Sequence, residues 1–144
     1  MTLPLEGKVA FITGSSRGIG KGIALCLAED GANIVVGARS DAAAANPLGS
    51  IENTAREIEA LGRRALAVKL DVTNDDEIRN AIDAAVRTFG RIDIIVNNAA
   101  KMGSGIGEYW GGTIDAMDDF YRTNVRAPFM ITQLVGPIMG RYGG

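Results

Sequence analysis

Histidine is absent from the 144 residues of this sequence, and cysteine occurs once, as Cys26. Without histidine, the chain cannot supply a Ser-His-Asp triad, a Cys-His pair or a histidine-ligated metal site. A single cysteine can form neither an internal disulfide nor a thiolate zinc site, so we expect no metal. Because Cys26 lies near Ile23 and Leu27 on an expected helix, we expect a buried structural thiol.

Strong charge of either sign and long apolar runs are also missing. The formal net charge is −2, with 15 Lys and Arg against 17 Asp and Glu, which gives no attraction to nucleic acid or an anionic membrane. No apolar stretch is long enough to span a bilayer, and no signal-peptide pattern is visible. We therefore expect a cytoplasmic protein that binds neither nucleic acid nor membrane.

The sequence is instead rich in apolar residues, with 47% hydrophobic and 22% charged, which is typical of a folded domain. Short apolar runs at residues 8–12, 33–37, 65–70 and 92–96 predict buried strands. Segments with helical periodicity follow them, at about residues 17–30, 51–61, 73–89 and 115–139. We expect a capping box at Thr73-Asn74-Asp75-Asp76, and a last helix that Pro128 and Pro137 kink or interrupt.

This alternation predicts an α/β fold, a doubly wound parallel sheet of Rossmann type with right-handed crossovers. Neither an internal repeat nor a break in composition divides the chain, so we expect a single domain over residues 1–144. In such sheets the ligand lies at the carboxyl ends of the strands, where the strand order reverses.

A glycine-rich octet, Thr13-Gly14-Ser15-Ser16-Arg17-Gly18-Ile19-Gly20, separates the first expected strand from its helix. A strand-turn-helix of this kind directs backbone N–H groups and the helix dipole at an anion, most simply a phosphate. Gly14 can adopt a turn conformation, Gly18 lets the backbone approach a diphosphate, and Gly20 lets the helix pack close to its strand. A magnesium-dependent phosphate loop does not fit, because Gly22 stands where it needs Ser or Thr. The alternative is a glycine-rich turn without a ligand.

The octet, together with Asn97-Asn98-Ala99-Ala100, resembles the short-chain dehydrogenase/reductase family over Gly7 to Gly144. The resemblance implies hydride transfer between a nicotinamide cofactor and the carbon of a small-molecule alcohol or carbonyl substrate. The candidate cofactor-binding residues are Gly14, Ser16, Arg17, Gly18, Ile19, Gly20, Arg39, Asp71, Val72, Asn98, Ala99 and Ala100.

The end of the second strand, Gly37-Ala38-Arg39-Ser40, bears on the choice of cofactor. An acid here would hold the adenosine ribose hydroxyls and repel a 2′-phosphate, but Ala38 and Arg39 replace it. Arg17 adds a second guanidinium within the octet, and two guanidiniums can clamp a phosphate. In the resembled family, basic residues at these places go with NADP(H). We therefore expect NADP(H) in preference to NAD(H), the alternative being two solvated surface arginines.

The other candidates also follow expected strands or lie on the last helix. By resemblance, Asp71 and Val72 contact adenine, although they equally suit a simple helix entry. The Asn97–Ala100 motif ends with Ala100 where the family usually has Gly, and an ordinary Asn-rich turn is the alternative. Asn124 matches a catalytic-relay asparagine of the family, and the alternative is a solvated helix face. The Tyr109-Trp110 pair could line a substrate pocket or pack within its loop.

The family's proton-transfer motif, Tyr-x-x-x-Lys, does not occur in this sequence. Tyr109 and Tyr121 are followed four residues later by Thr113 and Val125, and Tyr142 has no such position. We therefore expect the cofactor-binding half of a reductase, truncated after the fourth strand and its following helix, and inactive alone. An unpaired apolar fourth strand also predicts a homo-oligomer. The alternative is a non-catalytic protein that binds a nucleotide or a partner subunit.

Overall fold

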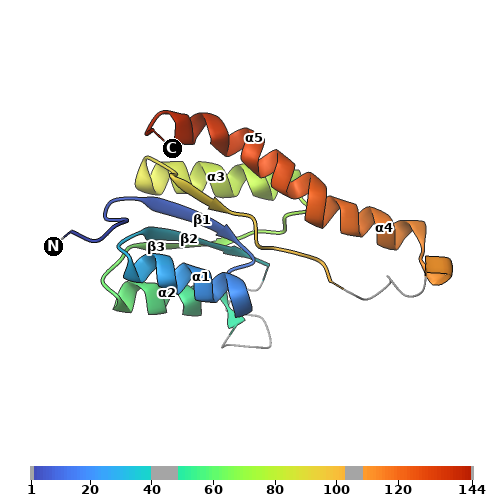
Figure 1. The fold of residues 1–144 in the computed structure, drawn as a ribbon, viewed down its shortest axis with the longest axis horizontal. Helices are drawn as coiled ribbons and strands as arrows, with labels where there is room; N and C mark the ends of the chain where they lie inside the picture. The colour runs from blue at the N-terminus through green and yellow to red at the C-terminus, as the bar shows by residue number, and fades with distance from the viewer. Residues whose placement is uncertain (1, 40–48, 103–108, 144) are drawn as a thin grey trace.

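The computed structural model describes residues 2–39, 49–102 and 109–143. Its strands form one parallel sheet in the order β3-β2-β1-β4 (Figure 1). The strands are β1 (Val9–Thr13), β2 (Asn33–Ala38), β3 (Ala65–Lys69) and β4 (Ile94–Val96). The helical segments are α1 (Gly18–Glu29), α2 (Ile51–Ala60), α3 (Asp75–Phe89), η2 (Tyr109–Gly111), α4 (Ile114–Tyr121), η3 (Arg122–Arg126) and α5 (Ala127–Gly140).

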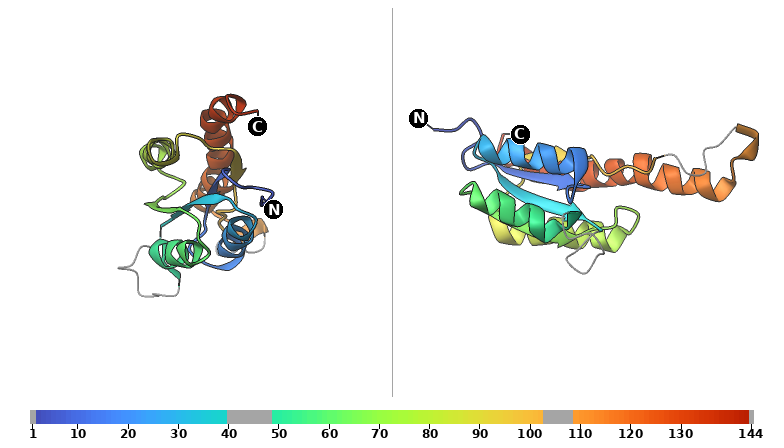
Figure 2. Two further views of the ribbon diagram at one scale, coloured as in Figure 1. Left: turned by 90° about the vertical axis from the view of Figure 1, so that its left-hand side faces the viewer. Right: turned by 90° about the horizontal axis from the view of Figure 1, so that it is seen from below.

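Helices cover both faces of the sheet, which explains why its central strands are apolar throughout rather than alternating. Val9 and Phe11 of β1 pack in a core with α3 and α5. Ala10 and Ile12, which point to the opposite face, pack with α1 and α2. The two helical layers lie on either side of the sheet in Figures 1 and 2. The predicted doubly wound parallel sheet is therefore confirmed.

The strand order reverses beside β1, which pairs with β2 on one side and β4 on the other. The chain moves outward from β1 to β2 and β3, then crosses back to place β4 on the far side of β1. This reversal brings the turn after β1 and the segment after β4 together at one edge of the sheet. Within the described residues, β4 has no second neighbour and forms an edge of the sheet.

The start of α3 differs in detail from the expected capping box. Asn74, and not Thr73, is the N-cap residue, and its side chain accepts hydrogen bonds from Asp76 N and Glu77 N. Thr73 instead donates its hydroxyl to Asp71. The capping function has moved by one residue because both side chains can cap a helix, and Thr73 is engaged by the preceding carboxylate.

Cys26 is exposed, so the expectation of a buried thiol was wrong. The buried face of α1 consists of Gly20, Ala24 and Ala28. Two residues beyond Ala24, Cys26 lies about 200° further around the helix and points away from the sheet. The neighbouring apolar residues Ile23 and Leu27 are only half-buried, which made them a poor guide to the buried face.

The last helical segment is not one regular helix, since the π-helical η3 joins α4 to α5. Ala127 N bonds to Arg122 O, five residues back. Pro128 has no N–H and cannot make the usual bond to the carbonyl of Asn124. The irregularity therefore comes before Pro128, whereas α5 continues through Pro137 without interruption. No described helix is long and apolar enough to cross a membrane.

Candidate functional site

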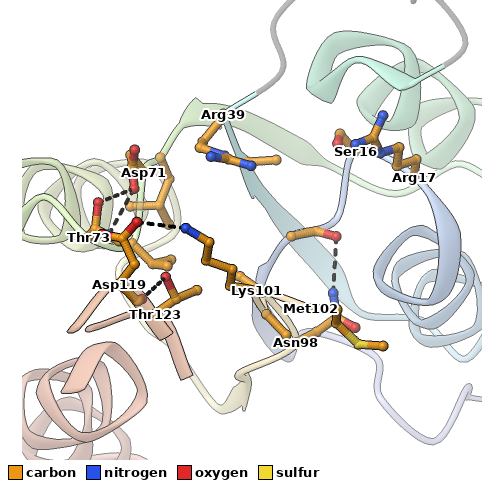
Figure 3. A pocket seen from close by; sticks show the side chains of 16 residues that line it. Ser16, Arg17, Arg39, Asp71, Thr73, Asn98, Lys101, Met102, Asp119 and Thr123 are labelled. Atoms are coloured by element: carbon orange, nitrogen blue, oxygen red, sulfur yellow. Dashed lines mark hydrogen bonds and ion pairs between the residues drawn. The ribbon is translucent and has the colours of Figure 1, made fainter. Parts of the chain in front are cut away.

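A cavity of about 480 Å³ opens at the carboxyl ends of the strands (Figure 3). Its size falls in the range of small-molecule and cofactor pockets. The predicted site residues that line it are Gly14, Ser16, Arg17, Arg39, Asp71, Val72, Asn98, Ala99 and Ala100. Four other candidates, Gly18, Ile19, Gly20 and Asn124, are not in its lining. The sheet thus gathers residues from the ends of β1, β2, β3 and β4 around one space.

The glycine turn has the backbone that its sequence predicts. Gly14 and Gly18 have φ values of 68° and 59°, in the left-handed region that favours glycine. A Cβ on Gly14 would lie 2.9 Å from the Cα of Ala99. Apart from its two chain neighbours and the backbone of its own helix, no described protein atom lies within 4 Å of the position that a Cβ on Gly18 would take. Protein atoms therefore crowd Gly14 and leave Gly18 open, which fits a turn that receives a ligand at its outer part.

Gly20 provides the close approach that was expected of it, although its partners include more than the strand. A Cβ at this position would overlap both the carbonyl oxygen of Gly14 and the side-chain amide nitrogen of Asn98. The absence of a side chain therefore lets α1 begin directly against the turn. Ile19, which precedes it, is 78% exposed on the first turn of α1.

Thr13 and Asn98 connect the turn after β1 to the segment after β4. The Asn98 amide nitrogen donates to the carbonyls of Thr13 and Gly14, at 3.0 Å each. Thr13 Oγ1 accepts hydrogen bonds from Asn98 N at 3.1 Å and from Ala99 N at 3.0 Å. The Asn side chain thus satisfies backbone groups of the neighbouring segment, as the motif predicts. Sequence reasoning missed Thr13, although a polar residue ending an apolar strand was a signal.

Ser15 forms a similar connection between β1 and β2, and it too was missed. Its hydroxyl is buried, donates to Ile12 O at 2.9 Å and accepts from Gly37 N at 3.1 Å. Thr54 of α2, also buried, donates to Ser16 O at 3.3 Å. These bonds fix the glycine turn from two further directions. They hold it in shape without a ligand, which lowers the ordering cost of binding one.

Arg17 and Arg39 are the cationic side chains of the cavity at the turn and at the end of β2 (Figure 3). Both residues are exposed, and Ala38, which also lines the cavity, stands where an acid would select against a 2′-phosphate. Ser40 lies outside the described residues. The arrangement places two guanidiniums beside one cavity, with no acid at Ala38 or Arg39 to oppose them.

Asp71 is held in its charged form at the same cavity. Its Oδ1 accepts hydrogen bonds from Thr73 N and Thr73 Oγ1, at 2.9 Å and 2.7 Å. Burial alone raises the pKa of Asp71, but the hydrogen bonds from Thr73 and the charge of Arg39 outweigh it, so the pKa lies below its ordinary value. Its backbone N–H is taken by Glu77 Oε2 at 2.7 Å. An oriented carboxylate beside Val72 can accept a hydrogen bond from an amino group lying on that side chain.

Asn124 is half-buried and reaches the cavity only through its partner. Its Oδ1 accepts from Lys101 N at 2.8 Å, and its Nδ2 donates to Lys101 O at 3.0 Å. The side chain is therefore used to hold the segment after β4 against η3. The expected catalytic relay stays a prediction. A π-helical turn at this residue is typical of functional positions in helices.

Sequence reasoning missed a group on the other side of the cavity, formed by Lys101, Asp119 and Thr123. Lys101 Nζ and Asp119 Oδ2 are 2.7 Å apart, and Thr123 Oγ1 donates to Asp119 O at 3.0 Å. The hydrogen bond and charge of Lys101 lower the pKa of Asp119. The signal for Lys101 was its place directly after the Asn97–Ala100 motif. Trp110 is 89% exposed and does not line this cavity.

These residues fit a phosphate-bearing nucleotide. The turn offers positive-φ glycines at a helix N-terminus, two arginines lie beside it, and an oriented carboxylate stands across the cavity. No group of three or more His, Cys, Asp or Glu that could hold a metal ion occurs in residues 2–39, 49–102 and 109–143.

Comparison with known proteins gives one consistent family. The model of the family described as short chain dehydrogenase matches residues 8–144. The chain is 51% identical over 104 residues to hydroxysteroid dehydrogenase-like protein 2 of Rattus norvegicus, which covers 69% of this chain and 20% of that protein. The protein of the same name from Danio rerio is 49% identical over 98 residues, with 68% and 24% covered.

Solved structures agree with these relatives. A putative dehydrogenase from Xanthomonas campestris superposes with a TM-score of 0.85 at 41% identity, covering 95% of this chain and 51% of that one. A hydroxysteroid dehydrogenase from Escherichia coli gives a TM-score of 0.82 at 36% identity, with 97% and 55% covered. The chain therefore spans about half the length of these structures, and 20% to 25% of curated relatives such as those from rat and Xenopus tropicalis.

Proposed function

Because the chain belongs to the short-chain dehydrogenase family, we propose that it forms the nucleotide-binding part of an NADP(H)-dependent oxidoreductase. Family membership supports oxidoreductase chemistry with a nicotinamide cofactor. The preference for NADP(H), the substrate and the contribution of each residue are parts of this proposal.

One observation carries the cofactor choice, namely that Arg17 and Arg39 line the same cavity while Ala38 occupies the position of a selective acid. A 2′-phosphate between two guanidiniums would receive charge-assisted hydrogen bonds from rigid donor forks. The ribose hydroxyls of NAD(H) would meet no carboxylate at position 38 or 39. NAD(H) also carries no 2′-phosphate for the two arginines to bind. The same residues therefore favour one cofactor and disfavour the other.

Each part of the cavity has a task in this proposal. When bound, the nicotinamide cofactor supplies the hydride acceptor or donor. The turn at Gly14 and Gly18 presents backbone N–H groups to the diphosphate, assisted by the N-terminus of α1. Asp71 and Val72 hold the adenine by one hydrogen bond and one apolar contact. Asn98, bonded to the turn, fixes the backbone of Ala99 and Ala100 beside the ribose.

For proton transfer, we propose Asn124 as a relay residue on the strength of the family resemblance. The side chain of Asn124 is hydrogen-bonded to the backbone of Lys101. Its backbone carbonyl lacks the N–H four residues further on that it would bond to in an α-helix, because residue 128 is proline. A carbonyl in that state can accept a hydrogen bond from a water molecule. The substrate we propose is a small-molecule alcohol or carbonyl compound, and the names of the relatives recommend hydroxysteroids for the first substrate panel.

A second candidate function is subunit interaction, and a specific observation favours it as an addition to catalysis. Exposed apolar side chains recur along α4, η3 and α5 at intervals of three or four residues. They are Ile114, Met117, Tyr121, Val125 and Phe129, between 52% and 77% exposed. Such spacing places them on one helical face, and an exposed apolar face of this length is typical of an interaction surface. We therefore propose a homo-oligomer, and the cytoplasmic location stays a prediction.

Titration of the protein with NADPH and NADH, followed by the fluorescence of the reduced nicotinamide, tests the proposed function. We expect saturable binding of both, with NADPH at least ten times tighter, about 1.4 kcal/mol. Equal dissociation constants would overturn the cofactor choice. Absence of binding to a folded protein would favour the non-catalytic interaction role, and sedimentation of that protein would then show whether the apolar face assembles.

A further inference from the structure

Residues of one helical stretch contact both the backbone and the side-chain ammonium of Lys101. Asn124 bonds to its backbone in both directions, at 2.8 Å and 3.0 Å, and Asp119 lies 2.7 Å from its Nζ. Asp119 belongs to α4 and Asn124 to η3, five residues further along. The side chain therefore has a fixed origin and a fixed end, which is unusual for a long flexible lysine.

The ion pair lies at the cavity itself. Lys101 and Asp119 both line it, together with Ala100 and Thr123. Figure 3 shows the lysine extended toward Asp119, on the side of the cavity where Asp71 and Thr73 lie. In the proposed function this is the adenine side. The ion pair thus keeps the ammonium of Lys101 at the wall of the cavity, next to Asp119.

The ion pair of Lys101 and Asp119 is too exposed to contribute much to the stability of the fold. The side chains of Lys101 and Asp119 are 39% and 57% exposed, and pairs of this kind contribute little to folding, about 0–1 kcal/mol. Its consequence for a ligand is different. A freed lysine would sample the cavity and lose rotamer freedom when a ligand entered. An unpaired Asp119 would in turn repel an anionic nucleotide.

We propose that Lys101 and Asp119 are positioning residues that form the wall of the nucleotide cavity on its adenine side and contribute to the affinity for both cofactors. The inference rests on the proposed function, because it assumes a dinucleotide in this cavity. It assigns to Lys101 a role distinct from that of Arg17 and Arg39, since a cation bound to Asp119 does not select the 2′-phosphate. The lowered pKa of Asp119 agrees with a carboxylate that stays charged and paired.

The test is a set of dissociation constants for NADPH and NADH with matched variants, each checked for folding by thermal melting. Asp119→Asn is expected to weaken both cofactors by about two- to fivefold, and Lys101→Met by about fivefold or more because it leaves the carboxylate unpaired. The double variant is expected to be no weaker than Asp119→Asn, and Lys101→Arg to retain most of the affinity. Glu6→Gln, which breaks the exposed Arg63–Glu6 pair outside the cavity, is the control and is expected to change nothing.

The outcomes separate the two proposals. If NADPH binds and both single variants keep the unmodified affinities, the positioning role of Lys101 and Asp119 is wrong, and the proposed function is unaffected. Tighter NADPH binding by Asp119→Asn, or a loss confined to NADPH in Lys101→Met, would overturn the positioning role in favour of a direct phosphate contact. Absence of NADPH binding in the unmodified folded protein would overturn both. The loss expected for Lys101→Met should shrink as salt rises, because it arises from the charge of an unpaired, solvent-accessible Asp119.

Discussion

The side-chain amide of Asn98 lies where a Cβ of residue 20 would have to be, and Gly20 is what makes room for it. The same amide nitrogen bonds to the carbonyls of Thr13 and Gly14. One asparagine therefore holds the turn after β1, the start of α1 and the segment after β4 in a single arrangement. The shape of the cavity depends on this relationship, because Gly14, Asn98 and Ala99 all line it.

Replacing Gly20 with alanine is the direct test of that relationship. The added methyl group would displace the Asn98 amide and leave two part-buried carbonyls without this donor, which costs up to about 1–3 kcal/mol for each unsatisfied group. We expect a lower free energy of unfolding in urea and weaker NADPH binding. Gly22→Ala, where nothing lies within 4 Å of the added group, is the matched control on the same helix. An unchanged Gly20→Ala variant would refute the close approach.

A second substitution separates ligand contact from backbone strain at the turn. Gly18→Val places a branched side chain at a φ of 59° in a region open to the proposed diphosphate. Gly62→Val imposes the same kind of strain, about 1–2 kcal/mol, at a φ of 79° on a residue that follows α2 and is not part of the glycine turn. We expect both variants to lose stability, and only Gly18→Val to lose dinucleotide binding. Undiminished NADPH affinity in a folded Gly18→Val protein would show that the octet is a turn that does not bind the diphosphate.

The residues at the end of β2, Ala38 and Arg39, should determine the preference between NADPH and NADH. Ala38→Asp combined with Arg39→Asn supplies the acid that binds ribose hydroxyls and removes one guanidinium. Hydrogen bonds to charged groups contribute about 1.5–3 kcal/mol, so NADPH affinity is expected to fall about 10- to 100-fold while NADH affinity rises. Arg87→Asn removes the same charge from the exposed last turn of α3 and serves as the control. A preference that stays the same in the double variant contradicts the assignment of Arg39.

Acid should destabilise the protein through Asp93, whose side chain is 5% exposed. Burial alone raises the pKa of Asp93, but the hydrogen bonds from Arg91 and Val9 N and the charges of Arg91 and Lys8 bring it below its ordinary value. The stabilisation is therefore present at neutral pH and is lost as the pH falls below about 3.9 toward the folded-state pKa. Urea unfolding from pH 7 to pH 3 should show Asp93→Asn less stable by about 1.5–3 kcal/mol at pH 7, and the difference should narrow at pH 3. A constant difference would show that the carboxylate does not titrate as described.

Much of this architecture follows from local sequence patterns. Strands, helices and the parallel sheet could be predicted because apolar runs and glycines mark each element. Gly14 and Asn98 could be placed at the same cavity because both follow strands at the same sheet edge. Cys26 was misplaced because its half-buried neighbours hid which face of α1 meets the sheet, a face made of small residues.

The long-range contacts could not be predicted. The partners Lys101 and Asp119 are 18 residues apart, and their meeting depends on the path of the chain between them. The π turn at η3 depends on how α4 and α5 are joined, although Pro128 was a visible cause. Thr13 and Ser15 show a further limit, because their buried hydroxyls bond to strands that the sequence does not reveal as neighbours.

The central claim is that this cavity binds the phosphorylated adenosine end of NADP(H) between Arg17 and Arg39. Calorimetric titration with 2′,5′-ADP (adenosine 2′,5′-bisphosphate) and with 5′-AMP measures it without the nicotinamide, since the two ligands differ only in the 2′-phosphate. We expect 2′,5′-ADP to bind at least tenfold more tightly, about 1.4 kcal/mol, and Arg39→Asn to reduce most of that difference. Equal affinities for the two ligands, or no binding of either to the folded protein, would contradict the account.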